Sequence, residues 1–337
     1  MVTNIEDIIT DGSILAERCV LRDGFVFTTV TYPANVYDAI VIKYPRNIHC
    51  SSPNLRASTR SLKDHIDFIQ SNKIDKALII AENIDFITAC PTLKHLHIVP
   101  ADSAGNNFDY SPLYRMPQIK SLSCSTIYGL RDEFSTSIDF AQINGLECVS
   151  AANGRQQNFN TVKTLKSLSL SGYKRQDLSD AFDSSILDTL TVIQSKIKSL
   201  DGIQKSQKMQ CLYLYYNRSL RDIGPLLHVK QTLRALRIEN CPKIEDFSVL
   251  GQLENLELLE LYGSNELPSL GFFKTMKKLK TFVFNINVLD GNLLPCLDLS
   301  YVYSERNRKH YNLKDCDLPK GEYARGNNTI ETWRRLE

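Results

Sequence analysis

The chain has 337 residues, of which 23% are charged and 42% are hydrophobic. These proportions exclude a disordered chain and a collagen-like one, and the length is enough for roughly two domains with a sizeable core. Forty Lys and Arg against 38 Asp and Glu leave a net charge of +2, which gives no reason to expect nucleic acid or an anionic membrane as a partner. The 42 leucines are distributed unevenly, with 13 up to Leu168 and 29 after it.

The N-terminal residues and the cysteines bear on where the protein is located in the cell. The first residues are acidic and lack a basic region followed by an apolar one, so we expect no secretory signal. No apolar run approaches the ~18 residues of a membrane-spanning helix. The nine cysteines form no CxxC pair, and their odd number disfavours a disulfide framework or a zinc site. We therefore predict reduced thiols in a cytoplasmic protein, and a secreted chain that has lost its signal is the alternative.

The first segment, residues 1–73, carries signals for strands and for one helix. Asp23-Gly24 lies between two β-rich runs and predicts a hairpin turn, and residues 35–43 predict a further strand. Ser61 and Asp64 have the spacing of a capping box, which predicts the start of an amphipathic helix. The apolar face of that helix would consist of Leu62, Ile66 and Ile69.

A short pattern with apolar residues at its first, fourth and sixth positions recurs along the rest of the chain. Leu256, Leu259 and Leu261 form one copy. In eleven copies the central apolar residue recurs on average about every 22 residues. One such pattern says little in a leucine-rich chain, but eleven in phase are not a chance result. The central positions are 78, 96, 122, 149, 168, 190, 212, 236, 259, 282 and 297.

This spacing resembles the leucine-rich repeat family, whose pattern is LxxLxLxxN/C followed by a variable arc. A side chain at the ninth position turns the backbone away from the strand and satisfies buried main-chain groups. Segments 220–226 and 244–250 resemble the returning arc of a short subclass, of about 22 residues, common in bacterial proteins and in phosphatase-regulating repeat proteins. The ninth position holds Asn83, Ser195, Asn217, Cys241, Ser264 and Asn287, whereas Ala101, Ile127, Gly154 and Tyr173 depart from the pattern.

The resemblance implies an α/β fold, namely a leucine-rich repeat solenoid (horseshoe) with a parallel concave β-sheet of about ten to eleven strands and short helical or 3₁₀ convex arcs. Each repeat buries apolar surface only against its neighbours, so both ends need covers. We expect an N-terminal β-hairpin and helix cap over 1–73, the repeats over 74–300, and a C-terminal cap with a short helix over 301–337. Trp333 in that helix is expected to seal the last repeat, and a docking site for a partner is the alternative.

Alternation along each strand sends the leucines inward and the intervening side chains onto the concave face. In the copies centred on residues 212, 236 and 259, that face places three tyrosines beside one arginine and two carboxylates. Tyr and Arg are enriched at binding hot spots, so we predict that this patch, about 10 Å wide, binds a partner. An ordinary solvated face is the alternative. The predicted partner-binding residues are Tyr213, Tyr215, Arg237, Glu239, Glu260 and Tyr262.

Few residues of the chain suggest a catalytic or metal-binding site. His95 and His97 point outward from one strand, but the neighbouring strand offers Ser121 and Ser123 rather than a third metal ligand. The outward thiols have no histidine or carboxylate beside them in the pattern, which argues against a nucleophile. The sequence lacks phosphate-loop, dinucleotide, zinc-protease and serine-hydrolase motifs. We predict no catalytic residue, no metal and no cofactor.

These features predict a non-enzymatic protein–protein interaction module that binds another protein, and neither nucleic acid nor a membrane, on its concave face. The resemblance implies a bacterial cytoplasmic protein with an immunity or regulatory role. One alternative is an enzyme or effector with a cryptic N-terminal activity that uses the repeats as substrate receptor. Nucleic-acid binding would need a basic concave stripe, where Arg237 is the one firm cation. The candidates for the cryptic activity are Asp23, Asp38, His49, Cys50, Asp64, His65 and Asp67.

Overall fold

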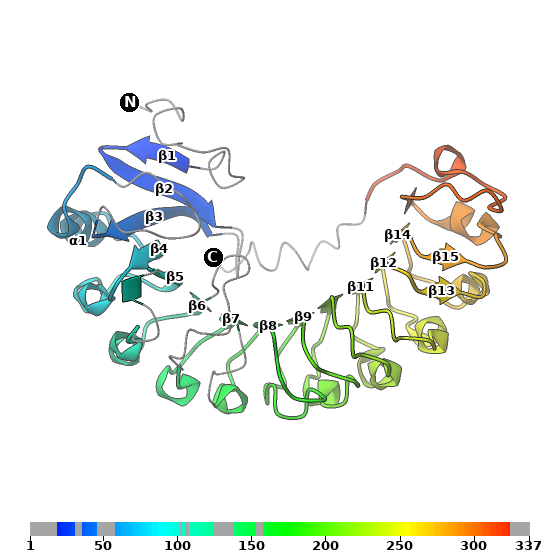
Figure 1. The fold of residues 1–337 in the computed structure, drawn as a ribbon, viewed down its shortest axis with the longest axis horizontal. Coiled ribbons are helices and arrows are strands. Elements are labelled where there is room, and N and C mark those ends of the chain that lie inside the picture. Colours follow the sequence, from blue (N-terminus) through cyan, green and yellow to red (C-terminus); the bar gives the residue numbers. More distant parts are fainter. Residues whose placement is uncertain are drawn as a thin grey trace. The chain divides into compact units, whose positions relative to one another are not determined.

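The computed structural model describes most of the chain, in two compact units. Among the described residues, the first unit extends to Val162 and the second begins at Lys163. Figure 1 draws the strands of the first unit in blue to green and those of the second in green to red. The described residues are 19–30, 36–45, 58–101, 103–104, 108–124, 138–152 and 158–323.

The first unit begins with antiparallel strands and continues with parallel ones. β1 (Cys19–Arg22) pairs with β2 (Phe25–Val30) around Asp23 and Gly24, whose φ angles of 52° and 84° form the turn. β2 pairs antiparallel with β3 (Val36–Tyr44), which confirms the predicted hairpin and the next strand. The strands that follow β3 are all parallel: β4 (Lys76–Ala81), β5 (His95–Pro100), β6 (Ser121–Cys124) and β7 (Cys148–Ala152).

Helix α1 (Leu62–Ser71) forms where the capping-box spacing predicts it. Ser61 Oγ accepts a hydrogen bond from Asp64 N at 3.1 Å, and Asp64 Oδ2 accepts one from Ser61 N at 2.8 Å. Two backbone donors at the start of the helix are thereby satisfied. Ile69 is fully buried, and His65 is buried beside it on the inner face.

The second unit contains seven parallel strands, one for each repeat. Their central apolar residues stand opposite one another, Leu168 beside Leu190 and Leu190 beside Leu212, so the sequence pattern sets the register. A separate pair of short strands, β13 (Glu266–Leu267) and β15 (Asn287–Val288), lies in the turns. The seven strands are β8 (Ser167–Ser171), β9 (Thr189–Ile193), β10 (Cys211–Tyr215), β11 (Ala235–Glu239), β12 (Leu258–Tyr262), β14 (Thr281–Phe284) and β16 (Tyr301–Ser304).

Short 3₁₀ helices form most of the arcs that return the chain from one strand to the next (Figure 1). The first unit has four repeat strands, β4 to β7, and the second has seven. These strands and the 3₁₀ arcs make the fold a leucine-rich repeat solenoid, as predicted. The 3₁₀ helices of the described residues are Asp85–Ala89, Ser111–Arg115, Phe140–Gln142, Phe159–Thr161, Ile203–Lys205, Gly224–Val229, Ser248–Gln252, Gly271–Lys274, Leu294–Asp298 and Asp315–Asp317.

The last copy of the pattern, centred on Leu297, is wrong as a strand prediction, because Leu294–Asp298 form a 3₁₀ helix. Pro295 has no N–H to donate to a strand ladder, and its fixed φ suits the first turn of a helix. Leu297 is accordingly 46% exposed. The last strand is instead β16, where Val302 pairs with Phe282.

A ladder of buried polar side chains runs beneath the strand ends of the second unit. Asn217 is fully buried, and its Oδ1 accepts a hydrogen bond from Ser195 N at 2.9 Å. Its Nδ2 donates to Val192 O at 2.8 Å. One ninth-position side chain therefore satisfies backbone groups of the preceding repeat, as the pattern predicts.

The ninth-position prediction fails at Ser264, which is exposed, because Asn265 occupies the buried place. Asn265 Nδ2 donates to the carbonyl oxygens of Cys241 at 3.1 Å and Ile244 at 2.9 Å. The turn after β12 is one residue longer than the turn after β11, with Gly263 at a φ of 131°. The extra residue shifts the buried position by one.

Other predicted features do not join this ladder. Asn83 is exposed in the first unit. Ile127, Gly154 and the expected C-terminal helix with Trp333 lie outside the described residues. Within the described part of the chain, the helices are all too short or too polar to cross a membrane.

Candidate functional site

The six predicted partner-binding residues form one cluster on β10, β11 and β12, which we name the concave patch. The parallel register arranges them in two adjacent rows of three. Because neighbouring strands lie ~4.8 Å apart, each side chain contacts the next row or the next strand. The first row is Tyr213, Arg237 and Glu260, and the second is Tyr215, Glu239 and Tyr262.

Arg237 holds the concave patch together. Its Nη2 and Nε donate hydrogen bonds to Glu239 Oε2 at 2.6 and 3.2 Å, and its Nη1 donates to Glu260 Oε2 at 3.2 Å. The guanidinium carbon lies 5.2 Å from the ring centroid of Tyr215 and 4.8 Å from that of Tyr262, both within cation–π range. These side chains order one another before any partner binds.

Only part of the concave patch is accessible to a partner. Tyr213 and Glu260 are each 6% exposed. The Tyr213 ring lies 6.5 Å from the Tyr215 ring, and Glu260 bonds to Arg237, so the two buried residues support their neighbours. The partly exposed residues are Tyr215, Arg237, Glu239 and Tyr262.

The sequence prediction missed one residue of this cluster, Tyr323. Its hydroxyl donates a hydrogen bond to Glu260 Oε1 at 2.7 Å, and its ring packs edge-on against Tyr301 of β16 with centroids 5.1 Å apart. Tyr323 is 63 residues from Glu260 and follows the last repeat. No periodic signal marks it, because its place depends on how the chain turns back after β16.

Burial and neighbouring charges fix the ionisation of the concave patch. Burial, with a smaller effect of Glu260, raises the pKa of Tyr262 to about 12, and burial also raises the pKa of Tyr215. Burial would lower the pKa of Arg237, but Tyr215, Glu239 and Glu260 raise it. Tyr215 and Tyr262 are therefore neutral near neutral pH. By formal charge, two carboxylates against one guanidinium leave a negative charge in excess.

His95 and His97 lie on β5 in the first unit. The parallel register places them opposite Ser121 and Ser123, as the sequence predicts. His95 is 8% exposed, and burial lowers its pKa. Among the described residues, three or more His, Cys, Asp or Glu nowhere come together in a group that could hold a metal ion.

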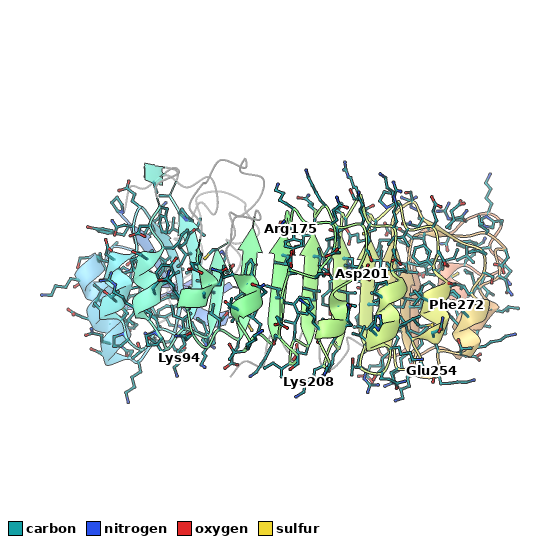
Figure 2. All side chains as sticks on the ribbon, turned by 90° about the horizontal axis from the view of Figure 1, so that it is seen from below. Lys94, Arg175, Asp201, Lys208, Glu254 and Phe272 are labelled. Atoms are coloured by element: carbon teal, nitrogen blue, oxygen red, sulfur yellow. The ribbon has the colours of Figure 1, made fainter. Side chains whose placement is uncertain are left out.

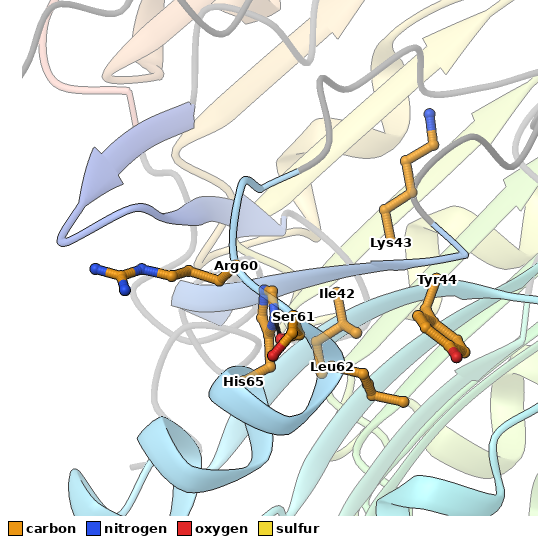
Figure 3. Close-up of a pocket in the computed structure, with 7 residues that line it drawn as sticks. All are labelled: Ile42, Lys43, Tyr44, Arg60, Ser61, Leu62 and His65. Atoms are coloured by element: carbon orange, nitrogen blue, oxygen red, sulfur yellow. Dashed lines mark hydrogen bonds between the residues drawn. The ribbon is translucent and has the colours of Figure 1, made fainter.

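A cavity of about 300 Å³ lies between β3 and the start of α1 in the first unit (Figure 3). Arg60 Nε and Nη2 donate to Asp23 O at 3.1 and 2.9 Å, which ties the helix start to the hairpin. His65 Nδ1 lies 2.8 Å from Ser61 O. The cavity is lined by Ile42, Lys43, Tyr44, Arg60, Ser61, Leu62 and His65.

This cavity bears on the alternative of a cryptic N-terminal activity. Of the candidates for that activity, His65 alone lines it. Asp64 caps the helix, and Asp23 contributes its backbone carbonyl to Arg60. The side chains of Asp38, His49 and Cys50 lie outside the described ones. Of the polar groups that line the cavity, Arg60, Ser61 and His65 have structural contacts.

Thiol reagents are expected to label Cys316 before the other described cysteines. Cys316 is exposed, whereas burial raises the pKa of Cys90 and Cys241 to about 11 and that of Cys296 to about 12. At pH 8 these three thiols are protonated and shielded, so they are poor nucleophiles. Timed alkylation with iodoacetamide and peptide mass spectrometry measures the order. Labelling of Cys241 at the rate of Cys316 would contradict the burial of the ladder.

Comparison with known proteins finds solved structures of low similarity. The chain matches no protein-family model, and its sequence matches no curated protein. An internalin from Listeria monocytogenes is similar in structure at 14% identity, over 76% of each chain, with a TM-score of 0.49. A leucine-rich repeat protein from Leptospira interrogans is similar at 13% identity over 74% of this chain and 82% of its own, with a TM-score of 0.32.

TLR13, solved in a complex with ssRNA13, is similar at 17% identity over 68% of this chain and 43% of its own, with a TM-score of 0.42. At these identities the likeness concerns the fold alone. The strands and arcs of the two units define that fold independently as a leucine-rich repeat solenoid.

Proposed function

We propose that the chain is a non-enzymatic protein–protein interaction module whose protein partner binds the accessible residues of the concave patch. The observation that carries this proposal is the guanidinium of Arg237, held between the rings of Tyr215 and Tyr262. Tyr and Arg dominate binding hot spots, and side chains that are already ordered lose little conformational entropy on binding. A partner that presents a cation to Glu239 fits the excess negative charge, which also disfavours nucleic acid.

The chemistry of the concave patch supports binding rather than catalysis. Both carboxylates bond to Arg237, so neither is poised as a general base. The pKa of Tyr262, raised to about 12, keeps its hydroxyl protonated near neutral pH. A nucleophile would need a depressed pKa or an adjacent base.

Finer assignments extend the same proposal. The spacing of about 22 residues and the 3₁₀ arcs support the short subclass found in bacterial and phosphatase-regulating repeat proteins. The buried cysteines Cys90, Cys241 and Cys296 form no disulfide, which supports a reducing compartment, and we propose a cytoplasmic location. An immunity or regulatory role suits a protein that binds its partner without transforming it.

Affinity purification with the variant Tyr215→Ala/Tyr262→Ala tests the proposal. Wild-type and variant chains are used to capture proteins from lysate of the cells that encode them, and quantitative mass spectrometry compares the captured proteins. Direct contact is then measured with the purified candidate. We expect a partner whose affinity falls at least about tenfold in the variant, because both rings that hold Arg237 are removed.

Tyr216→Ala is the matched control for this experiment. Tyr216 directly follows Tyr215, is 40% exposed and lies outside the concave patch. Circular dichroism verifies that each variant folds. A partner that binds all three proteins equally, or that is lost equally with Tyr216→Ala, would show that the concave patch is not its binding site.

A further inference from the structure

A row of exposed cations follows the ends of β8, β9 and β10 in the second unit. Arg175 lies in the turn after β8, Lys196 and Lys198 lie after β9, and Arg218 and Arg221 lie after β10. We name these five residues the basic rim. Backbone hydrogen bonds join its turns, for example from Arg221 N to Lys198 O at 2.9 Å. Figure 2 shows Arg175 at the edge of the sheet where the strand arrows end.

Within the part of the chain that the structure describes, the five side chains of the basic rim make no ion pair and no hydrogen bond. The opposite edge of the same sheet is different. There Lys163 pairs with Asp183, and Arg234 and Lys280 both pair with Glu257, at 3.8 and 3.0 Å. Several cations at that edge therefore have counter-charges, whereas the five cations of the basic rim have none among the described residues.

The carboxylates nearest to the basic rim in sequence accept hydrogen bonds within the turns. Asp177 Oδ1 accepts one from Ser179 N at 2.9 Å. Asp222 Oδ1 accepts a hydrogen bond from Gly224 N at 2.8 Å, and Asp201 Oδ2 accepts one from Ser199 Oγ at 2.9 Å. Such bonds hold the aspartates in the turns toward the arcs. Figure 2 shows Arg175 nearer than Asp201 to the edge where the strand arrows end.

We propose that the basic rim is a second interaction surface and that it binds an acidic polypeptide segment. Successive strands lie ~4.8 Å apart, so five cations are concentrated in three adjacent turns. Cations without counter-charges at this density attract a carboxylate-bearing partner and steer its encounter. The three arginines present planar forks that carboxylates bind with two hydrogen bonds.

An acidic polypeptide fits the basic rim better than nucleic acid does. A nucleic-acid backbone is charged at every step, and single strands bind through aromatic stacking platforms. Among the described residues of these turns, Tyr216 is the one exposed aromatic ring, and Asp177, Asp201 and Asp222 interrupt the positive charge. In a polypeptide the sequence sets the spacing of the carboxylates, so an acidic segment can contact the cations and avoid these aspartates.

Fluorescence anisotropy with the full chain and labelled peptides tests the proposal. The probe is a peptide of about 12 residues with alternating Glu and Ser, in about 50 mM salt, where screening is weak. The same peptide with Gln in place of Glu, and a single-stranded DNA oligonucleotide of equal length, are titrated in parallel. We expect saturable binding of the Glu peptide, weaker binding of the other two, and loss of affinity as salt is raised.

The variant Lys196→Glu/Arg218→Glu is expected to bind the Glu peptide at least about tenfold more weakly. Lys208→Glu/Lys277→Glu is the matched control, because it reverses two exposed lysines at the opposite edge and should stay within about twofold of wild type. Equal weakening by both variants, absence of saturable binding, or tighter binding of the oligonucleotide would each overturn the proposal. Tyr215→Ala/Tyr262→Ala should bind the peptide like wild type, which separates the basic rim from the concave patch.

Discussion

Replacing Asn217 with alanine is expected to lower the free energy of unfolding by about 3 kcal/mol. The side chain is fully buried, and its two hydrogen bonds satisfy Ser195 N and Val192 O. Alanine leaves both backbone groups buried without a partner, and each such group costs roughly 1–3 kcal/mol. Urea denaturation followed by circular dichroism measures the change as a lower midpoint at unchanged slope.

Ser264→Ala is the matched control for this prediction. The repeat pattern assigns Ser264 the same ninth position, but in the structure it is exposed and Asn265 fills the buried place. We expect a change of less than about 0.5 kcal/mol, which is typical of exposed positions. If Ser264→Ala lowered the free energy of unfolding as much as Asn217→Ala does, Ser264 would be the buried residue of this turn. The sequence pattern would then be right, and the burial of Asn265 in its place would be wrong.

Replacing Gly202 with alanine is expected to lower the free energy of unfolding by about 4 kcal/mol. Gly202 has a φ of 103°, which side chains with a Cβ rarely adopt. A Cβ there would overlap the backbone of Leu178 and Ser179 and lie 2.6 Å from Leu178 O. Backbone cannot move aside as a flexible side chain can, so the two repeats must separate. Thermal unfolding of the variant measures the loss.

Gly145→Ala measures how much of the loss of unfolding free energy comes from the positive φ alone. Gly145 also has a positive φ, of 82°, but a Cβ there would meet only Lys120 Nζ, at 3.6 Å. We expect a loss of about 1 kcal/mol, the cost of the strained φ alone. Equal losses at both glycines would show that the strained backbone, and not the contact between neighbouring repeats, accounts for the effect at Gly202.

The concave patch was predictable in part. The alternation of strand side chains is local, so the outward direction of Tyr215, Arg237 and Tyr262 follows from the position of each leucine in the pattern. Their closeness follows from the repeat length, because equal repeats place equivalent residues side by side. The burial of Tyr213 and Glu260 did not follow, since it depends on what covers the face.

Tyr323 and the basic rim illustrate two other limits of the sequence pattern. The contact of Tyr323 with Glu260 joins residues 63 positions apart, and only the path of the chain after β16 creates it. The cations of the basic rim can be read from the sequence, but so can the aspartates beside them, which would be expected to pair with those cations. Only the hydrogen bonds of Asp201 and Asp222 within the turns reveal that those carboxylates leave the cations unpaired.

The sequence by itself determined the repeating strand, its register and the face on which each side chain lies, because these depend on spacing within and between repeats. It also determined the α1 cap, where Ser61 and Asp64 bond to each other's backbone. The tertiary structure alone decided where the turns lengthen, as at Gly263, and where Pro295 replaces a strand with a 3₁₀ helix. It also decided which charges are paired, because turn length and ion pairing depend on neighbouring repeats that a local pattern does not contain.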